Sequence, residues 1–149
     1  MKEPLNQMKL ELESRSVNEG FARAAIAAFA AQLDPNVEEL TDLKTAVSEA
    51  VTNCIVHAYP EQRGKIYIWA GVYAQGLVRV RVRDKGCGIA NIAQARQPLF
   101  STQGEERAGL GFAVMESFMD RIRVRSTVSK GTTITLEKRV KGRVGAEQK

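Results

Sequence analysis

The chain has 149 residues, of which 44% are hydrophobic and 26% are charged, values typical of globular domains rather than of disordered or fibrous chains. This length predicts a single domain with one core. The longest apolar stretch, residues 21–33, is too short to span a membrane, and the first residues lack a signal-peptide pattern, so we expect a cytoplasmic protein. Cys54 and Cys87 form no CxxC pair, which argues against a disulfide framework or a cysteine zinc site.

The formal net charge is +5, and the basic excess lies near the end of the sequence. Residues 121–149 hold nine Lys or Arg against two Glu and contain no aromatic residue. Such a segment is typical of a solvated tail rather than of a phosphate-binding groove. We therefore expect one domain over residues 1–138 and a flexible basic tail over 139–149, with nucleic-acid binding as a minority hypothesis.

The first half of the chain predicts one strand followed by two helices. Apolar and polar residues alternate over residues 7–13, which favours a strand. Ser16, with Glu19 three residues later, has the pattern of a capping box and predicts a helix to about Leu33. A second helix is expected from about Asn36 to Ala58, with a broad apolar stripe facing the core.

The second half predicts two hairpins separated by a helix. Residues 65–73 and 77–83 are expected to form one hairpin, residues 109–119 a helix, and residues 122–128 and 132–137 a final hairpin. Strands and helices do not alternate strictly, so the predicted fold class is an α+β two-layer sandwich. It would have a mostly antiparallel mixed sheet of about four or five strands, with helices on one face.

Three polar residues in the second predicted helix are spaced by four. Glu49, Asn53 and His57 therefore project from successive turns along one edge. A carboxylate can accept a proton from a hydroxyl, and a carboxamide oxygen is a hard ligand suited to Mg²⁺. The spacing alone also fits the solvent boundary of an amphipathic helix, and by itself favours that simpler interpretation. His57 on its own is more simply explained as a structural residue.

A second motif, Asp84-Lys85-Gly86-Cys87-Gly88, directly follows a predicted strand. An aspartate there can accept hydrogen bonds, for example from a purine amine, and the glycines allow backbone to approach a flat ligand. An ordinary glycine turn is the alternative. The motif is not the dinucleotide fingerprint, because no GxGxxG opens a helix at this point.

A third motif is the polar run over residues 101–111, which ends in Gly109, Leu110 and Gly111. Free N–H groups and the helix dipole at the start of the following helix favour a phosphate. The run could also close as a lid, with Arg107 reaching a terminal phosphate. Neither a Walker A sequence nor the HRD and DFG motifs occur in the sequence, so phosphoryl transfer would need another scaffold.

Taken in order, these motifs resemble the GHKL (Bergerat) ATP-binding fold shared by gyrase B, Hsp90, histidine kinases and MutL. The matching boxes are Glu49-x3-Asn53-x3-His57, Asp84-x-Gly86-x-Gly88, Gly109-Leu110-Gly111 and Gly131-Thr132. Residues 48–53, 96–100 and 111–120 are most similar to the small serine kinases that act as anti-sigma factors in sporulation, of the sigma F type. The general-stress anti-sigma kinases are near relatives.

The resemblance implies a protein serine/threonine kinase that transfers the γ-phosphate of ATP to a serine. Glu49 would be its catalytic base, and Arg107 would contact the γ-phosphate. Asn53 would hold Mg²⁺, and ATP or ADP would be bound by Asn53, Asp84, Gly86, Gly88, Thr102, Gly109, Leu110, Gly111 and Thr132. Ala58, Ala108 and a lid about one residue short depart from the family pattern, which affects lid geometry rather than ATP binding.

The resemblance also implies the partners. Family members form homodimers that hold a sigma factor, and they phosphorylate a STAS-domain anti-anti-sigma protein. Arg23 is the candidate partner contact in the first helix, and neither direct nucleic-acid binding nor membrane binding is expected. The alternatives are a general-stress anti-sigma kinase and a nucleotide-gated sigma-binding module without kinase activity.

Overall fold

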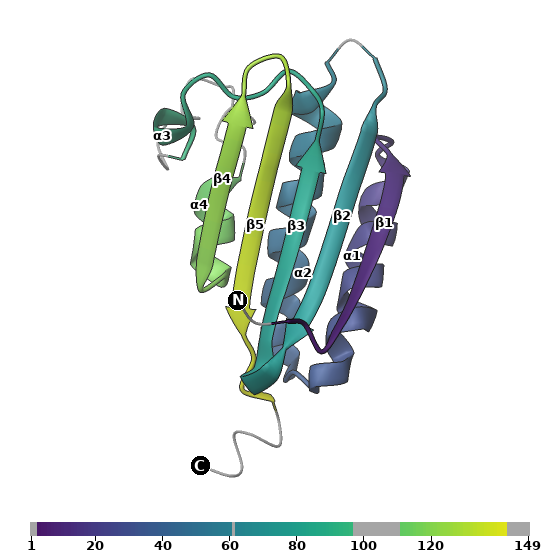
Figure 1. Ribbon diagram of the computed structural model, residues 1–149, viewed down its shortest axis with the longest axis vertical. Coiled ribbons are helices and arrows are strands. Elements are labelled where there is room, and N and C mark those ends of the chain that lie inside the picture. The colour runs from purple at the N-terminus through teal and green to yellow at the C-terminus, as the bar shows by residue number, and fades with distance from the viewer. Residues whose placement is uncertain (1–2, 61, 97–110, 143–149) are drawn as a thin grey trace.

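The computed structural model describes residues 3–60, 62–96 and 111–142. They form one antiparallel five-stranded sheet in the order β1-β2-β3-β5-β4, with helices α1, α2 and α4 on one face (Figure 1). The strands are β1 Asn6–Glu13, β2 Lys65–Tyr73, β3 Leu77–Asp84, β4 Arg121–Thr127 and β5 Gly131–Arg139. The helices are α1 Val17–Ala30, α2 Val37–Asn53, α3 Ile92–Ala95 and α4 Phe112–Phe118. The predicted two-layer α+β sandwich is confirmed.

The core lies between the sheet and the three helices α1, α2 and α4. Val80 and Val82 of β3 pair with Leu136 and Ile134 of β5, and all four side chains are buried. Because side chains alternate along a strand, the residues between them point to the opposite, uncovered face of the sheet. None of the helices within the described ranges is long and apolar enough to cross a membrane.

The starts of α1 and α2 differ in how their first N–H groups are satisfied. The Asn36 side chain accepts from the Glu39 N–H at 2.7 Å, and the Glu39 carboxylate accepts from the Asn36 N–H at 3.0 Å, which completes a capping box. The capping box expected at Ser16 is wrong, because the Ser16 side chain makes no cap hydrogen bond. Glu19 instead accepts from the Ser48 hydroxyl of α2.

The end of α2 also differs from the expected single helix to Ala58. The α-helix stops at Asn53 and continues as a π-helical turn, Cys54–Ala58. A π turn is wider than an α turn, so the four-residue spacing no longer places His57 directly in line with Glu49 and Asn53. Glu49 and Asn53 remain one α turn apart.

The basic residues after position 120 are ordered where the structure describes them. Arg121, Arg123 and Arg125 belong to strand β4, which confirms the strand expected over residues 122–128 and places these charges in the sheet. Strand β5 runs past the expected boundary to Arg139, and the N–H groups of Lys141 and Gly142 donate to the Glu39 carboxylate. Residues 143–149 lie outside the described ranges.

Candidate functional site

A small cavity of about 30 Å³ lies where β3 ends and β5 begins, beside the end of α2. Four sequence-predicted residues line it, namely Asn53, Asp84, Gly88 and Thr132, together with His57, Ala58, Ile89 and Ile134. These residues come from segments far apart in the sequence, which the antiparallel pairing of β3 and β5 brings together. The structure therefore brings together residues from three of the sequence motifs: Asn53 of the helix motif, Asp84 and Gly88 of the aspartate-glycine motif, and Thr132.

Asp84 is the buried acidic group of this cavity, with 6% of its surface exposed. Its Oδ1 accepts the N–H groups of Gly86 at 3.0 Å and Thr132 at 3.2 Å. Burial raises the pKa of the carboxyl group, and the two backbone hydrogen bonds oppose that rise. A carboxylate held in this way by the protein backbone is fixed in position before any ligand arrives.

Cys54 lies beneath Asp84 and was not singled out from the sequence as a site residue. Its Sγ is 3.6 Å from Asp84 Oδ2, and burial, followed by the charge of Asp84, raises the thiol pKa well above its ordinary value. The thiol therefore keeps its proton at neutral pH and donates weakly to the carboxylate. Its place on the apolar stripe of the helix gave no signal of this contact, which depends on where β3 ends.

Thr132 is held by Ser126 of β4, a second residue that the motifs did not indicate. Their hydroxyl oxygens lie 2.7 Å apart, and Ser126 Oγ also accepts the Ile89 N–H at 2.7 Å. This fixes the Thr132 side chain next to the cavity, while its N–H is bound to Asp84. The segment after Gly88 is thereby tied to the β4–β5 hairpin.

Packing within the protein requires glycine at two positions after Asp84, Gly86 and Gly88. A Cβ at Gly86 would collide with the Ala58 carbonyl, and a Cβ at Gly88, where φ is +80°, would collide with the Thr127 carbonyl. These close backbone approaches explain why side chains are excluded at both positions. The expected role of these glycines in approaching a ligand is therefore accompanied by a packing requirement.

Glu49 lies one turn before Asn53 on α2 and faces the start of α4. Gly111, with φ of +68°, precedes α4, and a Cβ at this position would collide with Glu49 Oε1. The carboxylate expected to act as a base thus borders the end of the glycine box. Thr102, Arg107, Gly109 and Leu110 lie outside the described residues, as does most of the expected lid.

Arg23 shares a second cavity with Glu49. This surface cavity of about 380 Å³ lies between α1 and α2 and is lined by Arg23, Thr41, Lys44, Thr45, Ser48 and Glu49. The Arg23 guanidinium is 3.3 Å from the Glu19 carboxylate and 3.4 Å from the Ser48 hydroxyl. These contacts orient Arg23 within the cavity that Glu49 also lines.

The residues around Asn53 are compatible with Mg²⁺. Within the described ranges, no group of three or more His, Cys, Asp or Glu side chains could hold a metal ion by itself. Mg²⁺ bound with a nucleotide takes few protein ligands, because it keeps several waters and binds phosphate oxygens. The Asn53 carboxamide, which lines the small cavity one turn from Glu49, fits that kind of site.

Comparisons with known proteins identify the family of the chain. The model of the histidine kinase-like ATPase domain matches residues 11–138. The chain is 54% identical over 136 residues to an anti-sigma F factor of Geobacillus thermodenitrificans, covering 91% of this chain and 93% of the relative. It is 50% identical over 135 residues to an anti-sigma F factor of Priestia megaterium, covering 89% and 92%.

Solved structures show the same fold. The RsbU and RsbW domains of Rv1364c from Mycobacterium tuberculosis match with a TM-score of 0.67 and 23% identity, over 92% of this chain and 32% of that one. A histidine kinase domain from Erythrobacter litoralis matches with a TM-score of 0.55 and 18% identity, over 82% and 61%. From the family match and the curated relatives together, the chain belongs to the histidine kinase-like ATPase family and, within it, to the anti-sigma F factors.

Proposed function

We propose that this chain is a cytoplasmic, homodimeric anti-sigma factor that binds and inhibits a sporulation sigma factor of the sigma F type. We further propose that it is an ATP-dependent serine kinase that phosphorylates and inactivates a STAS-domain anti-anti-sigma protein. The observation that carries the proposal is that Asn53 and Asp84 line one cavity and Glu49 lies one helical turn before Asn53. In this proposal Glu49 is the base, Asn53 the metal ligand and Asp84 the adenine acceptor.

Asp84 is suited to recognise the amino group of adenine. Each carboxylate oxygen can accept two hydrogen bonds, so Oδ2, which accepts the Cys54 thiol, retains capacity for a ligand N–H. The adenine amino group donates, and a buried acceptor discriminates strongly against a ligand that cannot donate. Thr132 would assist through a water molecule.

Glu49 is suited to activate the serine of a protein substrate. It borders both Gly111 and the cavity that holds Arg23, so a hydroxyl entering between α1 and α2 would meet its carboxylate. General-base catalysis of this kind contributes roughly 10²- to 10⁴-fold to a rate. Mg²⁺, held by Asn53 and the nucleotide, would supply charge neutralisation on the phosphates.

The proposal is tested by incubating the purified protein with Mg²⁺, γ-labelled ATP and a STAS-domain protein, and by locating the label with mass spectrometry. We expect phosphoserine on the STAS protein. Glu49→Ala should lower the transfer rate by about 10²- to 10⁴-fold while ATP binding persists. Glu38→Ala is the matched control, because Glu38 is exposed at the other end of the same helix. Equal transfer rates for Glu49→Ala and Glu38→Ala would contradict the role of Glu49.

The same preparation separates the alternative functions. Retention of a sigma F type factor in the presence of ATP or ADP, without phosphoserine on the STAS protein, would leave a nucleotide-gated binding module. Tighter retention of a general-stress sigma factor than of a sigma F type factor would favour the general-stress assignment. Loss of ATP binding in Glu49→Ala would show that the carboxylate supports the site rather than the transfer.

A further inference from the structure

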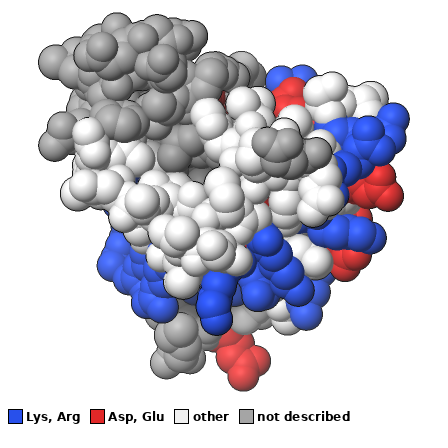
Figure 2. Space-filling view, turned by 90° about the horizontal axis from the view of Figure 1, so that it is seen from above, with Lys and Arg blue, Asp and Glu red and all other residues white. Residues whose placement is uncertain are grey.

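The sheet face opposite the helices carries a groove lined by arginines. In Figure 2, Lys and Arg side chains gather along the lower edge of the view, and others lie on its right-hand side. The groove has a volume of about 560 Å³ and is lined by Arg79, Arg81, Arg121, Arg123, Arg125, Thr133, Thr135 and Glu137. None of these residues belongs to the proposed kinase site. This set is called the arginine groove below.

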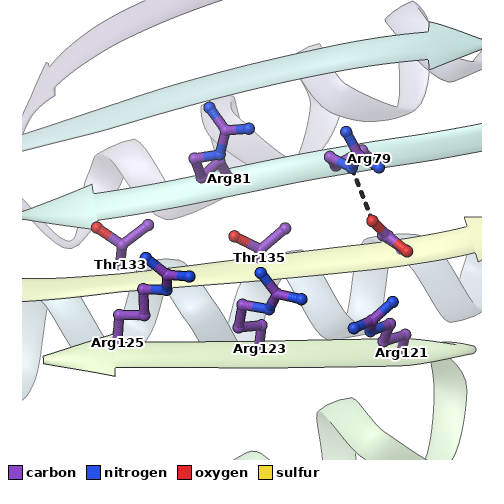
Figure 3. Close-up of a pocket in the computed structure, with 8 residues that line it drawn as sticks. Arg79, Arg81, Arg121, Arg123, Arg125, Thr133 and Thr135 are labelled. Atoms are coloured by element: carbon purple, nitrogen blue, oxygen red, sulfur yellow. Dashed lines mark hydrogen bonds and ion pairs between the residues drawn. The ribbon is translucent and has the colours of Figure 1, made fainter. Parts of the chain in front are cut away.

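The strand register arranges the arginine groove in two rows. β5 lies between β3 and β4, so Thr135 has Arg81 on one side and Arg123 on the other (Figure 3). Glu137 lies in the same way between Arg79 and Arg121. Neighbouring strands are about 4.8 Å apart, which puts the two rows about 10 Å apart. The short threonine side chains between them form the floor.

The arginine groove has a strong excess of positive charge. Five arginines face one glutamate among its lining residues, and guanidinium groups stay charged at any pH that the protein meets. The Glu137 carboxylate already accepts a hydrogen bond from Arg79, with 2.7 Å between Nε and Oε2. The side chains of Arg121, Arg123 and Arg125 are exposed. Like charges gathered in this way repel one another unless an anion lies between them.

We propose that the arginine groove binds an extended acidic segment of a partner protein. Side chains of an extended polypeptide point alternately to either side, and those on one side are about 6.6–6.8 Å apart. Successive arginines of each row, which lie two residues apart along β3 or β4, have the same spacing. Consecutive Asp or Glu residues lying over β5 would therefore reach both rows in turn. Arg forms strong, often bidentate hydrogen bonds with carboxylates.

Two other occupants fit the groove less well. A single-stranded nucleic acid needs aromatic surfaces for base stacking, and the groove lining has none. The nearby Trp69 ring is covered by Arg81, whose guanidinium carbon lies 4.7 Å from the ring centre. A second copy of this chain would bring its own arginine groove against this one, which the repulsion between like charges opposes.

The experiment uses fluorescence anisotropy with a labelled peptide that carries six consecutive glutamates, and a matched peptide with six glutamines. We expect the glutamate peptide to bind, more weakly as salt rises, and the glutamine peptide not to bind. The double variant Arg123→Gln/Arg125→Gln should weaken binding at least tenfold. Arg15→Gln/Arg63→Gln, which removes the same charge at exposed positions off the groove, should weaken it less than twofold.

A second variant keeps the test decisive if the double variant fails to fold, as judged by circular dichroism. Thr135→Glu places a carboxylate between the two rows and should compete with the peptide, weakening binding at least tenfold. Absence of peptide binding at low salt overturns the proposal, as does equal weakening by the two double variants. Tighter binding of an oligothymidylate than of the glutamate peptide, lost in Arg123→Gln/Arg125→Gln, would also overturn it, in favour of a nucleic-acid surface.

Discussion

The cavity around Asp84 and the arginine groove both carry charged side chains, but these are buried and hydrogen-bonded in the cavity and mostly exposed in the groove. Asp84 is buried, and its carboxylate accepts two backbone N–H groups and a thiol. Arg123 and Arg125 are exposed on the uncovered face of the sheet. A polar group with internal partners is pre-organised for a small ligand and costly to alter, whereas exposed charges contribute little to stability and are available to a partner.

Asp84→Asn, in the cavity around Asp84, should have the largest effect on ATP affinity. Asparagine can still accept the N–H groups of Gly86 and Thr132, so the fold should survive, but its amide offers a donor where the carboxylate accepted. We expect ATP affinity, measured by calorimetry, to fall about 100-fold. Asp120→Asn is the control, since Asp120 is exposed and precedes β4; a comparable loss of affinity there would break the contrast.

Gly111→Ala tests the contact between the α4 start and Glu49. A Cβ at φ of +68° is strained and would collide with the Glu49 carboxylate, so we expect a loss of about 1–3 kcal/mol in the free energy of unfolding. Gly20→Ala is the matched comparison, because its Cβ would meet only the Arg23 guanidinium at 3.7 Å. That variant should be stabilised by up to about 1 kcal/mol; equal destabilisation of the two would be inconsistent with a close approach at Gly111.

The starts of α1 and α2 give a second comparison, between a capping side chain that is hydrogen-bonded and one that is not. Asn36→Ala removes the side-chain half of an observed capping box, and should lower the free energy of unfolding by about 1 kcal/mol. Ser16→Ala removes a hydroxyl that makes no cap hydrogen bond, so its effect should stay within about 0.5 kcal/mol. Urea unfolding of both variants measures the difference, and a larger loss at Ser16 would reverse the interpretation.

The smallest expected effect is a pH dependence at Asp84. Because burial raises its pKa from the ordinary value of 3.8, the folded state holds this proton at a pH where the unfolded chain has lost it. The stabilisation is complete below the unfolded pKa and is lost as pH rises through the folded pKa. Unfolding from about pH 4 to neutrality should therefore show Asp84→Asn gaining stability relative to the original chain. A constant difference across that range would be the contrary result.

The local elements could be predicted from the sequence because local patterns determine them. The alternating valines of residues 78–82 predicted strand β3. Asp84 directly follows this alternation, which indicated a polar group at the end of the strand. Neighbouring patterns also indicated Glu49 and Asn53 on one helix edge. Each of these depends on residues within a few positions of one another.

Features that depend on tertiary pairing could not be predicted. Ser16 and Glu19 have the pattern of a capping box, but Ser48 of α2 supplies the hydrogen-bond partner of Glu19. The strand that carries Arg123 and Arg125 was predicted, but its position across β5 from Arg79 and Arg81 was not, because no local pattern determines the strand order. The Cys54 contact with Asp84 likewise depends on where α2 and β3 end.

The central claim is that Asp84 accepts the amino group of adenine. Comparing ATP with inosine triphosphate, which has a carbonyl oxygen in place of that amino group, tests it in one titration series with the original chain and Asp84→Asn. The account predicts that the original chain prefers ATP by about 100-fold and that this preference disappears or reverses in Asp84→Asn. Equal affinity of the original chain for both nucleotides, or an unchanged preference in the variant, would contradict it.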